Sequence, residues 1–174
     1  MDALKKLIRT IPDFPRKGIQ YRDLTTLFLD PGGFRQSVSA MAAQYRGKDI
    51  DAVVGIESRG FIIAAPLAVE MGKGFVPIRK PGKLPGETFG VEYTLEYGED
   101  RLEIHTDALA MGSRVLLVDD LLATGGTMEA ACKLIEHIGC EVVGCAFLVE
   151  LVELKGRDRI QRYPITNLVE FQGE

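Results

Sequence analysis

The chain has 174 residues, of which 46% are hydrophobic and 26% are charged, and its formal net charge is −4. This size and composition predict one domain, residues 1–174, with a substantial core. The negative charge argues against a protein that binds nucleic acid by bulk electrostatics, because such domains carry an excess of basic residues.

The N-terminus and the longest apolar run favour a cytoplasmic protein with no membrane partner. That run, residues 61–69, is too short to cross a bilayer and contains Pro66. Residues 1–12 carry charges within their apolar stretch and do not have the pattern of a signal peptide.

The cysteines and histidines do not have the spacing of a metal site. Cys132, Cys140 and Cys145 leave one thiol unpaired in any disulfide scheme, which favours reduced, buried thiols. His105 and His137 lie far apart in the sequence, so we expect no structural zinc site.

From about residue 50 onward, short apolar runs alternate with segments of helical period. The runs are rich in β-branched residues without polar alternation, as in strands that are buried on both faces of a parallel sheet; they are residues 51–56, 74–78, 114–119 and 141–149. Helices are expected at residues 31–47, 59–71 and 127–139. The second should end at Gly72, and Pro66 should delay its start or kink it. This order predicts right-handed βαβ units and an α/β fold, with a central, mostly parallel sheet flanked by helices.

Residues 79–112 break this rhythm. Residues 79–90 are rich in Pro, Gly and Lys and predict a loop, while 91–97 and 100–106 predict an antiparallel hairpin that turns at Gly98 and Glu99. Because long irregular loops in compact domains often serve as lids, residues 79–105 are a candidate lid loop and hairpin.

Residues 115–127, VLLVDDLLATGGT, join two carboxylates to a Gly-Gly loop. Asp119 and Asp120 end a predicted strand, and ligands of open α/β sheets bind beyond the carboxyl ends of strands. The loop leads into a helix N-terminus, where unpaired N–H groups favour an anion. A sugar phosphate would suit both features, since carboxylates accept hydrogen bonds from hydroxyls and also attract Mg²⁺. The plainer alternative is a tight turn in which Thr127 caps the helix.

A second anion site is expected at the same edge of the sheet. Residues 55–60 join the first clear strand to its helix and contain Arg59, a fixed cation with bidentate donors. Arg79, Lys80 and Lys83 end or follow the next strand. Each could be a solvated surface charge, but their shared position at strand ends favours a diphosphate site.

VLLVDDLLATGGT resembles the phosphoribosyl-diphosphate (PRPP) binding motif of type I phosphoribosyltransferases. Five further segments are similar to those of the adenine phosphoribosyltransferases, and they occur in order over nearly the whole chain; they are residues 11–28, 56–61, 78–88, 95–109 and 148–160. The resemblance implies a type I phosphoribosyltransferase fold with a small N-terminal hood, residues 1–30, and a flexible lid.

The resemblance also implies roles for the PRPP-binding residues. Asp119 and Asp120 would face the ribose hydroxyls. The 5′-phosphate would be wrapped by the loop residues Ala123, Thr124, Gly125, Gly126 and Thr127. The pyrophosphate would be met by residues of the two other strand-end segments, namely Glu57, Ser58, Arg59, Arg79, Lys80 and Lys83. A non-proline cis peptide is expected between Glu57 and Ser58.

The base would lie under the hood. Tyr21 would stack on the purine, backbone groups around Gln20 and Arg22 would read its edge, and Arg22 would serve more as a structural cation. Gln20 departs from the family pattern, which has an aliphatic residue there. Glu96 is the candidate for proton transfer near the purine, with Arg59 and Lys83 stabilising the leaving group, and Tyr97 would help to close the lid.

The implied reaction is adenine plus PRPP giving AMP and pyrophosphate, with Mg²⁺ held mainly by substrate, in a homodimer. Two alternatives remain open in the sequence. One is a phosphoribosyltransferase for another nucleobase, and the other is a regulator that senses PRPP without catalysis. An intact basic lid and Glu96 argue against the regulator.

Overall fold

The computed structural model describes residues 1–95 and 98–173. Its centre is a parallel sheet in the order β4-β3-β7-β8-β9. The strands are β3 (Ala52–Ile56), β4 (Gly74–Ile78), β7 (Arg114–Leu122), β8 (Glu141–Leu151) and β9 (Ile165–Phe171). The predicted α/β class with a mainly parallel sheet is therefore confirmed.

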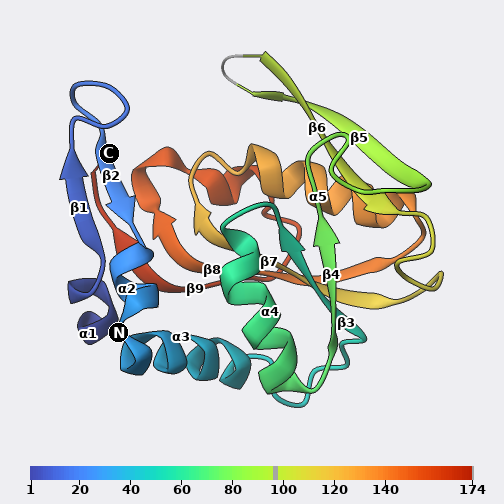
Figure 1. Ribbon diagram of the computed structural model, residues 1–174, viewed down its shortest axis with the longest axis horizontal. Coiled ribbons are helices and arrows are strands. Elements are labelled where there is room, and N and C mark those ends of the chain that lie inside the picture. The colour runs from blue at the N-terminus through green and yellow to red at the C-terminus, as the bar shows by residue number, and fades with distance from the viewer. Residues whose placement is uncertain (96–97, 174) are drawn as a thin grey trace.

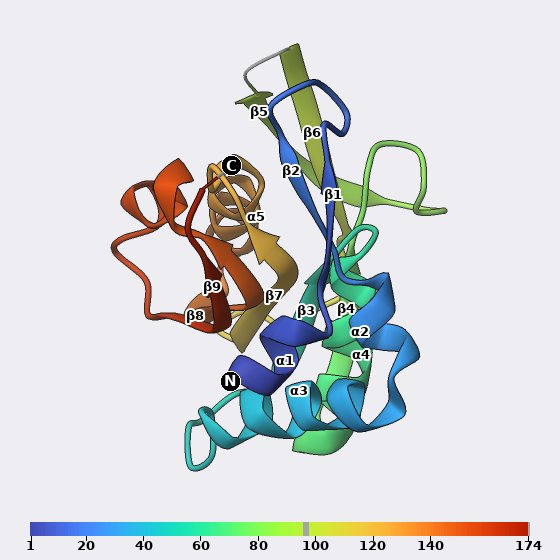
Figure 2. The ribbon, with the colours of Figure 1, turned by 90° about the vertical axis from the view of Figure 1, so that its left-hand side faces the viewer.

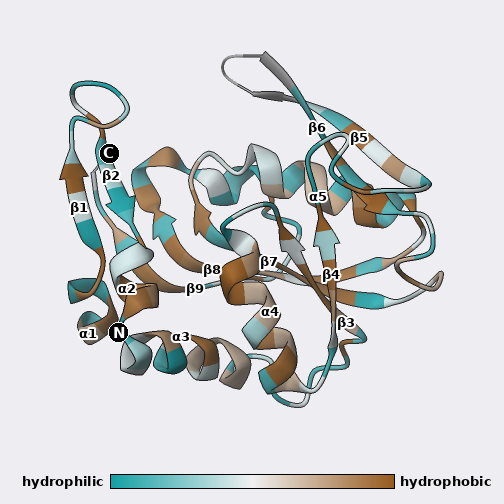
Figure 3. Ribbon diagram, viewed as in Figure 1, coloured by the Kyte–Doolittle hydropathy of each residue, from teal (hydrophilic) through white to brown (hydrophobic). Residues whose placement is uncertain are grey.

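Helices cover both faces of this sheet, which explains the unbroken apolar runs of its inner strands. In β3, Val53 belongs to the cluster beneath α3 (Pro31–Ala43) and α4 (Gly60–Met71). Its neighbour Val54 belongs to the cluster beneath α5 (Gly126–His137). Because successive strand residues point to opposite faces, each inner strand must be apolar on both. Figure 3 shows hydrophobic residues concentrated along these strands and α4.

The helix predictions are correct in type and differ at their ends. α3 stops at Ala43, and Asp30 caps its start by accepting a hydrogen bond of 2.6 Å from the Gly33 N–H. α4 begins at Gly60 and ends before Gly72, whose φ of 64° is left-handed, so Pro66 does not delay the helix.

Two antiparallel hairpins stand beside the sheet. The first joins β1 (Arg9–Pro12) to β2 (Gln20–Asp23) and lies between the short helices α1 (Asp2–Lys6) and α2 (Thr25–Leu29). The second joins β5 (Thr88–Leu95) to β6 (Gly98–His105). Figures 1 and 2 show both hairpins projecting on the side toward which the sheet strands point. They therefore flank the carboxyl edge of the sheet.

The observed limits of the second hairpin differ from the predicted ones in two places. Gly98 pairs with Leu95, so Gly98 and Glu99 belong to β6 and do not form the turn. β5 begins at Thr88, which shortens the predicted loop of 79–90, because Thr88 pairs with His105 across the hairpin. The two short 3-10 helices near the C-terminus, Val152–Leu154 and Gly156–Arg159, precede β9.

Candidate functional site

Most of the predicted site residues that the structure describes lie where the sheet reverses its order. The chain runs from β3 outward to β4 and then returns to place β7 on the other side of β3. α4, which follows β3, and α5, which follows β7, pack on opposite faces. Ligands of open α/β sheets bind in the crevice at such a point, beyond the carboxyl ends of the strands.

Asp119 and Asp120 lie within the last part of β7, which continues to Leu122 and so is longer than predicted. The last pair between β3 and β7 joins Gly55 to Val118, so both carboxylates extend past the end of β3. The extra residues remain in strand form because β8 continues to pair with them, as Leu121 does with Val149. The carboxylates therefore sit in the crevice and not at a free strand end.

The two carboxyl groups have an unusual electrostatic environment. Burial raises the pKa of Asp119 well above its ordinary value, and the adjacent charge of Asp120 adds to the effect. Burial also raises the pKa of Asp120, although the positive charge of Arg59 opposes this. Asp119 Oδ1 accepts a hydrogen bond of 2.9 Å from the Asp120 N–H. Such a pair is ready to accept hydrogen bonds from a polar ligand.

Gly60 holds Asp119 in place from the start of α4. A Cβ at Gly60 would lie 2.7 Å from Asp119 Oδ1 and 3.2 Å from the Val118 carbonyl oxygen. Only glycine allows this approach of helix and strand. Sequence reasoning assigned Gly60 no role, although its place beside Arg59 in a strand-to-helix loop was a usable signal.

The Gly-Gly loop opens onto an uncapped helix. α5 begins at Gly126, with Gly125 at the N-cap position (φ 83°) and no side chain capping the helix. The alternative in which Thr127 caps a tight turn is therefore wrong, because Thr127 lies inside the first turn. Uncapped N–H groups at a helix start favour an anion. A cavity of about 80 Å³ lies here, lined by residues that include Asp119, Phe147 and the loop from Leu121 to Met128.

Gly156 supports this loop from behind. A Cβ at Gly125 would lie 2.4 Å from the Gly156 carbonyl oxygen, and a Cβ at Gly156 would lie 2.2 Å from that of Ala123. Two glycines thus allow two backbone segments to touch. Nothing in the local sequence around Gly156 indicates this contact, because its partner is distant along the chain.

The cations after β4 are held by carboxylates. Glu57 Oε1 accepts from Arg79 Nη2 at 2.9 Å, and Glu57 Oε2 accepts from the Lys80 N–H at 2.9 Å. The hydrogen bond from Arg79 is the main reason that the pKa of Glu57 is lowered. Glu57 therefore ties the end of β3 to the end of β4. The Glu57–Ser58 peptide bond is cis, as expected.

The second hairpin contacts the same cations. Lys80 Nζ donates to Asp100 and, at 3.1 Å, to the hydroxyl of Tyr93. Burial lowers the pKa of Lys80, but these two partners outweigh it and the net shift is upward. Lys83 is exposed. Asp100 was not predicted. Glu96 and Tyr97 lie outside the described residues.

The first hairpin reaches the crevice through Tyr21. The Tyr21 hydroxyl accepts a hydrogen bond of 2.5 Å from Arg59 Nη1, and Phe14 packs edge-on against the Tyr21 ring at 5.1 Å. Arg22 lies over the ring of Phe171 in β9, at 4.3 Å, and donates to Thr10 Oγ1. Alternation along β2 puts Gln20 on the same strand face as Arg22.

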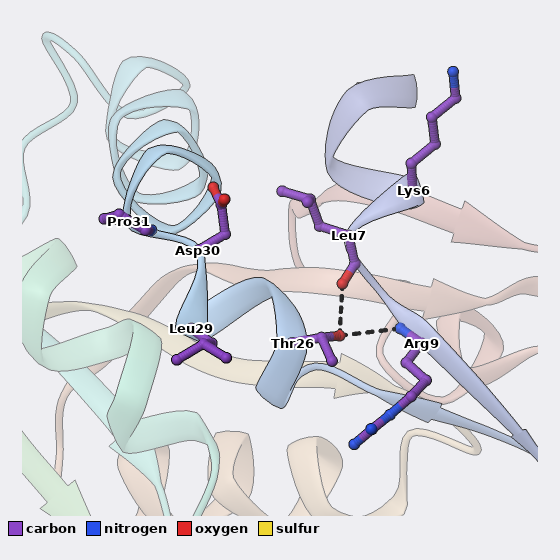
Figure 4. Close-up of a pocket in the computed structure, with 7 residues that line it drawn as sticks. All are labelled: Lys6, Leu7, Arg9, Thr26, Leu29, Asp30 and Pro31. Atoms are coloured by element: carbon purple, nitrogen blue, oxygen red, sulfur yellow. Dashed lines mark hydrogen bonds between the residues drawn. The ribbon is translucent and has the colours of Figure 1, made fainter.

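A larger cavity lies elsewhere. It measures about 470 Å³ and is lined by residues of α1, β1, α2 and the start of α3. Figure 4 shows Thr26 at its centre, where Thr26 Oγ1 donates to the Leu7 carbonyl at 2.6 Å and accepts from the Arg9 N–H at 3.2 Å. Its lining includes none of the predicted site residues that the structure describes. The crevice is the candidate site because of the charged and glycine-rich residues that line it, although its cavity is smaller.

The donor set in the crevice suits a shared magnesium ion better than a protein-held one. Within residues 1–95 and 98–173, no group of three His, Cys, Asp or Glu side chains could hold a metal. Asp119 and Asp120 supply carboxylate oxygens, the ligand type that Mg²⁺ prefers. Two such residues would need oxygens from a bound substrate to complete the coordination.

Comparison with known proteins gives the class of this fold and site. The family of the phosphoribosyl transferase domain matches residues 28–172. An adenine phosphoribosyltransferase of Clostridium perfringens is 57% identical over 97% of this chain and 98% of its own. The chain belongs to the adenine phosphoribosyltransferase family.

Solved structures agree with this assignment. The adenine phosphoribosyltransferase of Thermoanaerobacter pseudethanolicus matches with a TM-score of 0.94 and 49% identity, over 98% of this chain and 99% of that one. The Saccharomyces cerevisiae enzyme, solved with an imino-altritol bisphosphate and adenine, matches with a TM-score of 0.90 and 40% identity, over 95% and 96%. The resemblance found in the sequence is confirmed.

Proposed function

We propose that this protein transfers the 5-phosphoribosyl group of PRPP to adenine, giving AMP and pyrophosphate, in purine salvage. One observation carries the proposal. Two carboxylates, the half-buried Asp119 and the buried Asp120, stand between an uncapped helix start and Arg59 at the switch point of the sheet. The helix start would bind the 5′-phosphate of PRPP, the carboxylates its ribose, and Arg59 its diphosphate. These three groups follow one another in the same order along PRPP. The names of the relatives support adenine as the acceptor.

The ribose 5-phosphate end of PRPP would bind along β7 and the loop after it. Asp119 and Asp120 accept hydrogen bonds from the ribose hydroxyls. The 5′-phosphate lies against the N–H groups of residues 123–127 at the uncapped start of α5. Gly125 and Gly126 let the backbone approach the phosphate closely.

The diphosphate would lie against Arg59, Arg79, Lys80 and Lys83. When the bond from ribose C1 to the diphosphate oxygen breaks, positive charge develops on the sugar and negative charge on the leaving group. Preorganised cations stabilise that leaving charge more than they stabilise the bound substrate. Glu57 and Ser58 shape this loop, and Glu57 directs Arg79, since a carboxylate would repel the diphosphate itself.

Mg²⁺ would enter with PRPP and neutralise part of the diphosphate charge. Asp119 and Asp120 are the described residues best suited to meet such an ion, directly or through water. The chain's own cations then act on the remaining charge. Lid residues of the loop after β4 exclude water, which would otherwise hydrolyse PRPP.

Adenine would bind beneath the first hairpin. Tyr21 stacks on the purine, and backbone groups around Gln20 and Arg22 bond its edge. The packing of Arg22 against Phe171 supports a structural role for that side chain. A purine nitrogen attacks C1 and needs position more than activation. Glu96 either assists the loss of the proton from adenine or forms a hydrogen bond with one of its ring nitrogens.

We also infer a homodimer and a cytoplasmic location. Ile62 and Val69 leave one face of α4 apolar and exposed, at 42% and 80% of their surfaces, which suits a subunit interface. The Sγ atoms of Cys132 and Cys145 are 3.7 Å apart, at hydrogen-bond distance, and form no disulfide, as a reducing compartment would keep them. No helix among residues 1–95 and 98–173 is long and apolar enough to span a membrane.

The first test is AMP formation from adenine and PRPP with Mg²⁺, beside hypoxanthine and guanine. We expect turnover with adenine alone, and a loss of roughly a hundredfold or more in Asp119→Asn/Asp120→Asn. Turnover with another base would make the protein a phosphoribosyltransferase for that nucleobase. Gln20, which departs from the family pattern, would then be the first residue to test for the change in base preference. Tight PRPP binding without turnover would make the protein a regulator.

A further inference from the structure

Glu150 is a buried carboxylate near the end of β8, and its partner lies on another segment. Its side chain is 5% exposed, and both of its oxygens accept from Arg157 Nε at 2.8 Å. Arg157 Nη2 lies 2.7 Å from Glu150 Oε2 and also donates to Asn167 Oδ1 on β9 at 2.6 Å. The guanidinium of Arg157 is therefore held in one place by side chains of two neighbouring strands.

Glu150 is linked to the Gly-Gly loop, residues 123–127, by two routes. Its backbone pairs with Leu122, the residue directly before the loop. Its side chain holds Arg157, which directly follows Gly156 in the sequence. Gly156 is the glycine whose backbone touches the loop so closely that no Cβ would fit between them. Glu150 thus fixes both of the backbone segments that meet there.

This ion pair contributes geometry more than stability. A buried pair is often no more stabilising than apolar residues of the same volume, because the cost of desolvating two charges offsets their attraction. A guanidinium that is bound through several N–H groups, however, is fixed in direction as well as in distance. Among the described residues, those that line the cavity at the start of α5 do not include Glu150. Its effect on a ligand there would pass through Arg157 and Gly156.

We propose that Glu150 is a positioning residue for the 5′-phosphate of the substrate: through Arg157 it holds Gly156 against the loop whose N–H groups bind that phosphate. The proposal rests on the function given above. No side chain caps the start of α5, so the phosphate depends on backbone N–H groups, and these must stay aimed at it. The support behind the loop therefore decides how well the phosphate is bound.

The sign of the effect separates positioning from direct electrostatics. Loss of the negative charge of Glu150 would strengthen phosphate binding if that charge acted on the phosphate directly, because like charges repel. If Glu150 acts through Arg157 and Gly156, its loss weakens phosphate binding instead, because the loop loses its support. The diphosphate, which would lie against the cations that follow β3 and β4, should be bound as before.

The variant Glu150→Gln tests this with two probes that carry different parts of PRPP. Calorimetric titration with ribose 5-phosphate measures the 5′-phosphate site, and titration with pyrophosphate and Mg²⁺ measures the diphosphate site. We expect the Kd for ribose 5-phosphate to rise by roughly tenfold and the Kd for pyrophosphate to change by less than about twofold. General damage to the fold would weaken the binding of both probes.

A second variant, Arg157→Lys, does not leave the buried carboxylate without a cation. It removes the planar fork of the guanidinium and keeps the charge beside Glu150, so it should weaken ribose 5-phosphate binding in the same selective way. Because both residues act along one route, the double variant Glu150→Gln/Arg157→Lys should bind this probe no more weakly than the weaker single variant.

Glu136→Gln is the matched control. It removes a carboxylate that also pairs with an arginine, Arg162, at 2.5 Å, but it lies in the last turn of α5, at the end away from the loop. Both Kd values should stay unchanged. Unchanged or tighter ribose 5-phosphate binding by Glu150→Gln, or equal weakening of both probes, would overturn this inference alone. A wild type that binds no ribose 5-phosphate would overturn the proposed function as well.

Discussion

At Glu57, one carboxylate ties the ends of two neighbouring strands together. It accepts from Arg79 and from the Lys80 N–H, and these contacts lower its pKa. A carboxylate whose pKa is lowered on folding stabilises the protein above its unfolded pKa. That stability is lost as the pH falls through the folded pKa. Glu57 should therefore contribute to the free energy of unfolding as well as to the geometry of the site.

Glu57→Gln should lower the free energy of unfolding by about 1 kcal/mol at pH 7, since Arg79 is partly exposed and its pairing is screened. The deficit should shrink as the pH falls from about 4.3, the ordinary pKa of glutamate, through the lowered pKa of folded Glu57. Urea denaturation at pH 7 and pH 3.5 measures both values. Glu153→Gln, at an exposed residue, is the control. A deficit that is the same at both pH values would contradict the pKa argument.

The loop after β7 depends on a second element for its shape. Gly125 and Gly156 permit contact between the Gly-Gly loop, residues 123–127, and the 3-10 segment Gly156–Arg159. On the other side, Gly60 brings the start of α4 against Asp119. The backbone of three elements thus packs closely around the crevice and fixes its shape. Small displacements of reacting groups would lower the rate of the reaction.

Gly156→Ala should raise the KM for PRPP by roughly ten- to a hundredfold, because the new Cβ would push the Ala123 carbonyl and displace the loop. The KM for adenine should change much less. Steady-state kinetics with each substrate varied in turn separates the two. Gly74→Ala, where a Cβ meets nothing within 4 Å, controls for the substitution itself. An unchanged KM for PRPP would show that the loop does not depend on Gly156.

At the scale of the whole molecule, segments from near the two ends of the chain come together beside the first hairpin. The Phe171 ring in β9 receives Arg22 from β2 and, at 4.7 Å, Lys5 from α1. Figure 1 shows β9 running beside this hairpin, with the C-terminus near its strands. The C-terminal strand therefore supports the segment that we propose to bind the base.

The proposed dimer adds a prediction at this scale. Val69→Lys should weaken self-association by roughly a hundredfold or more, because an interface would bury an unpaired charge. Sedimentation velocity over a range of concentrations measures it. Met111→Lys places the same charge on a side chain that is 89% exposed, away from α4, and should not change association. A Val69→Lys protein that remains dimeric would exclude this face of α4.

The sequence predicted those elements that have a clear pattern within their own segment of the chain. β3 and β4 were predicted to within a residue at each end, because unbroken apolar runs between turns identify strands buried on both faces. β1, β2 and β9 were not predicted as strands, since each is partly exposed and takes its form from a partner. The start of α5 was also predicted to within a residue, at 127 where the helix begins at Gly126.

By itself, the sequence determined the α/β class, the strand ends that meet in the crevice, and the family resemblance, because periodicity, glycine loops and charged motifs are properties of short segments. Only the tertiary structure decided that Arg59 contacts both Tyr21 and Asp120, that Glu57 binds Arg79, and that Gly156 packs against the Gly-Gly loop. The partners in these contacts lie on different elements. Their distances depend on how the sheet twists and how the helices pack, which no local pattern encodes.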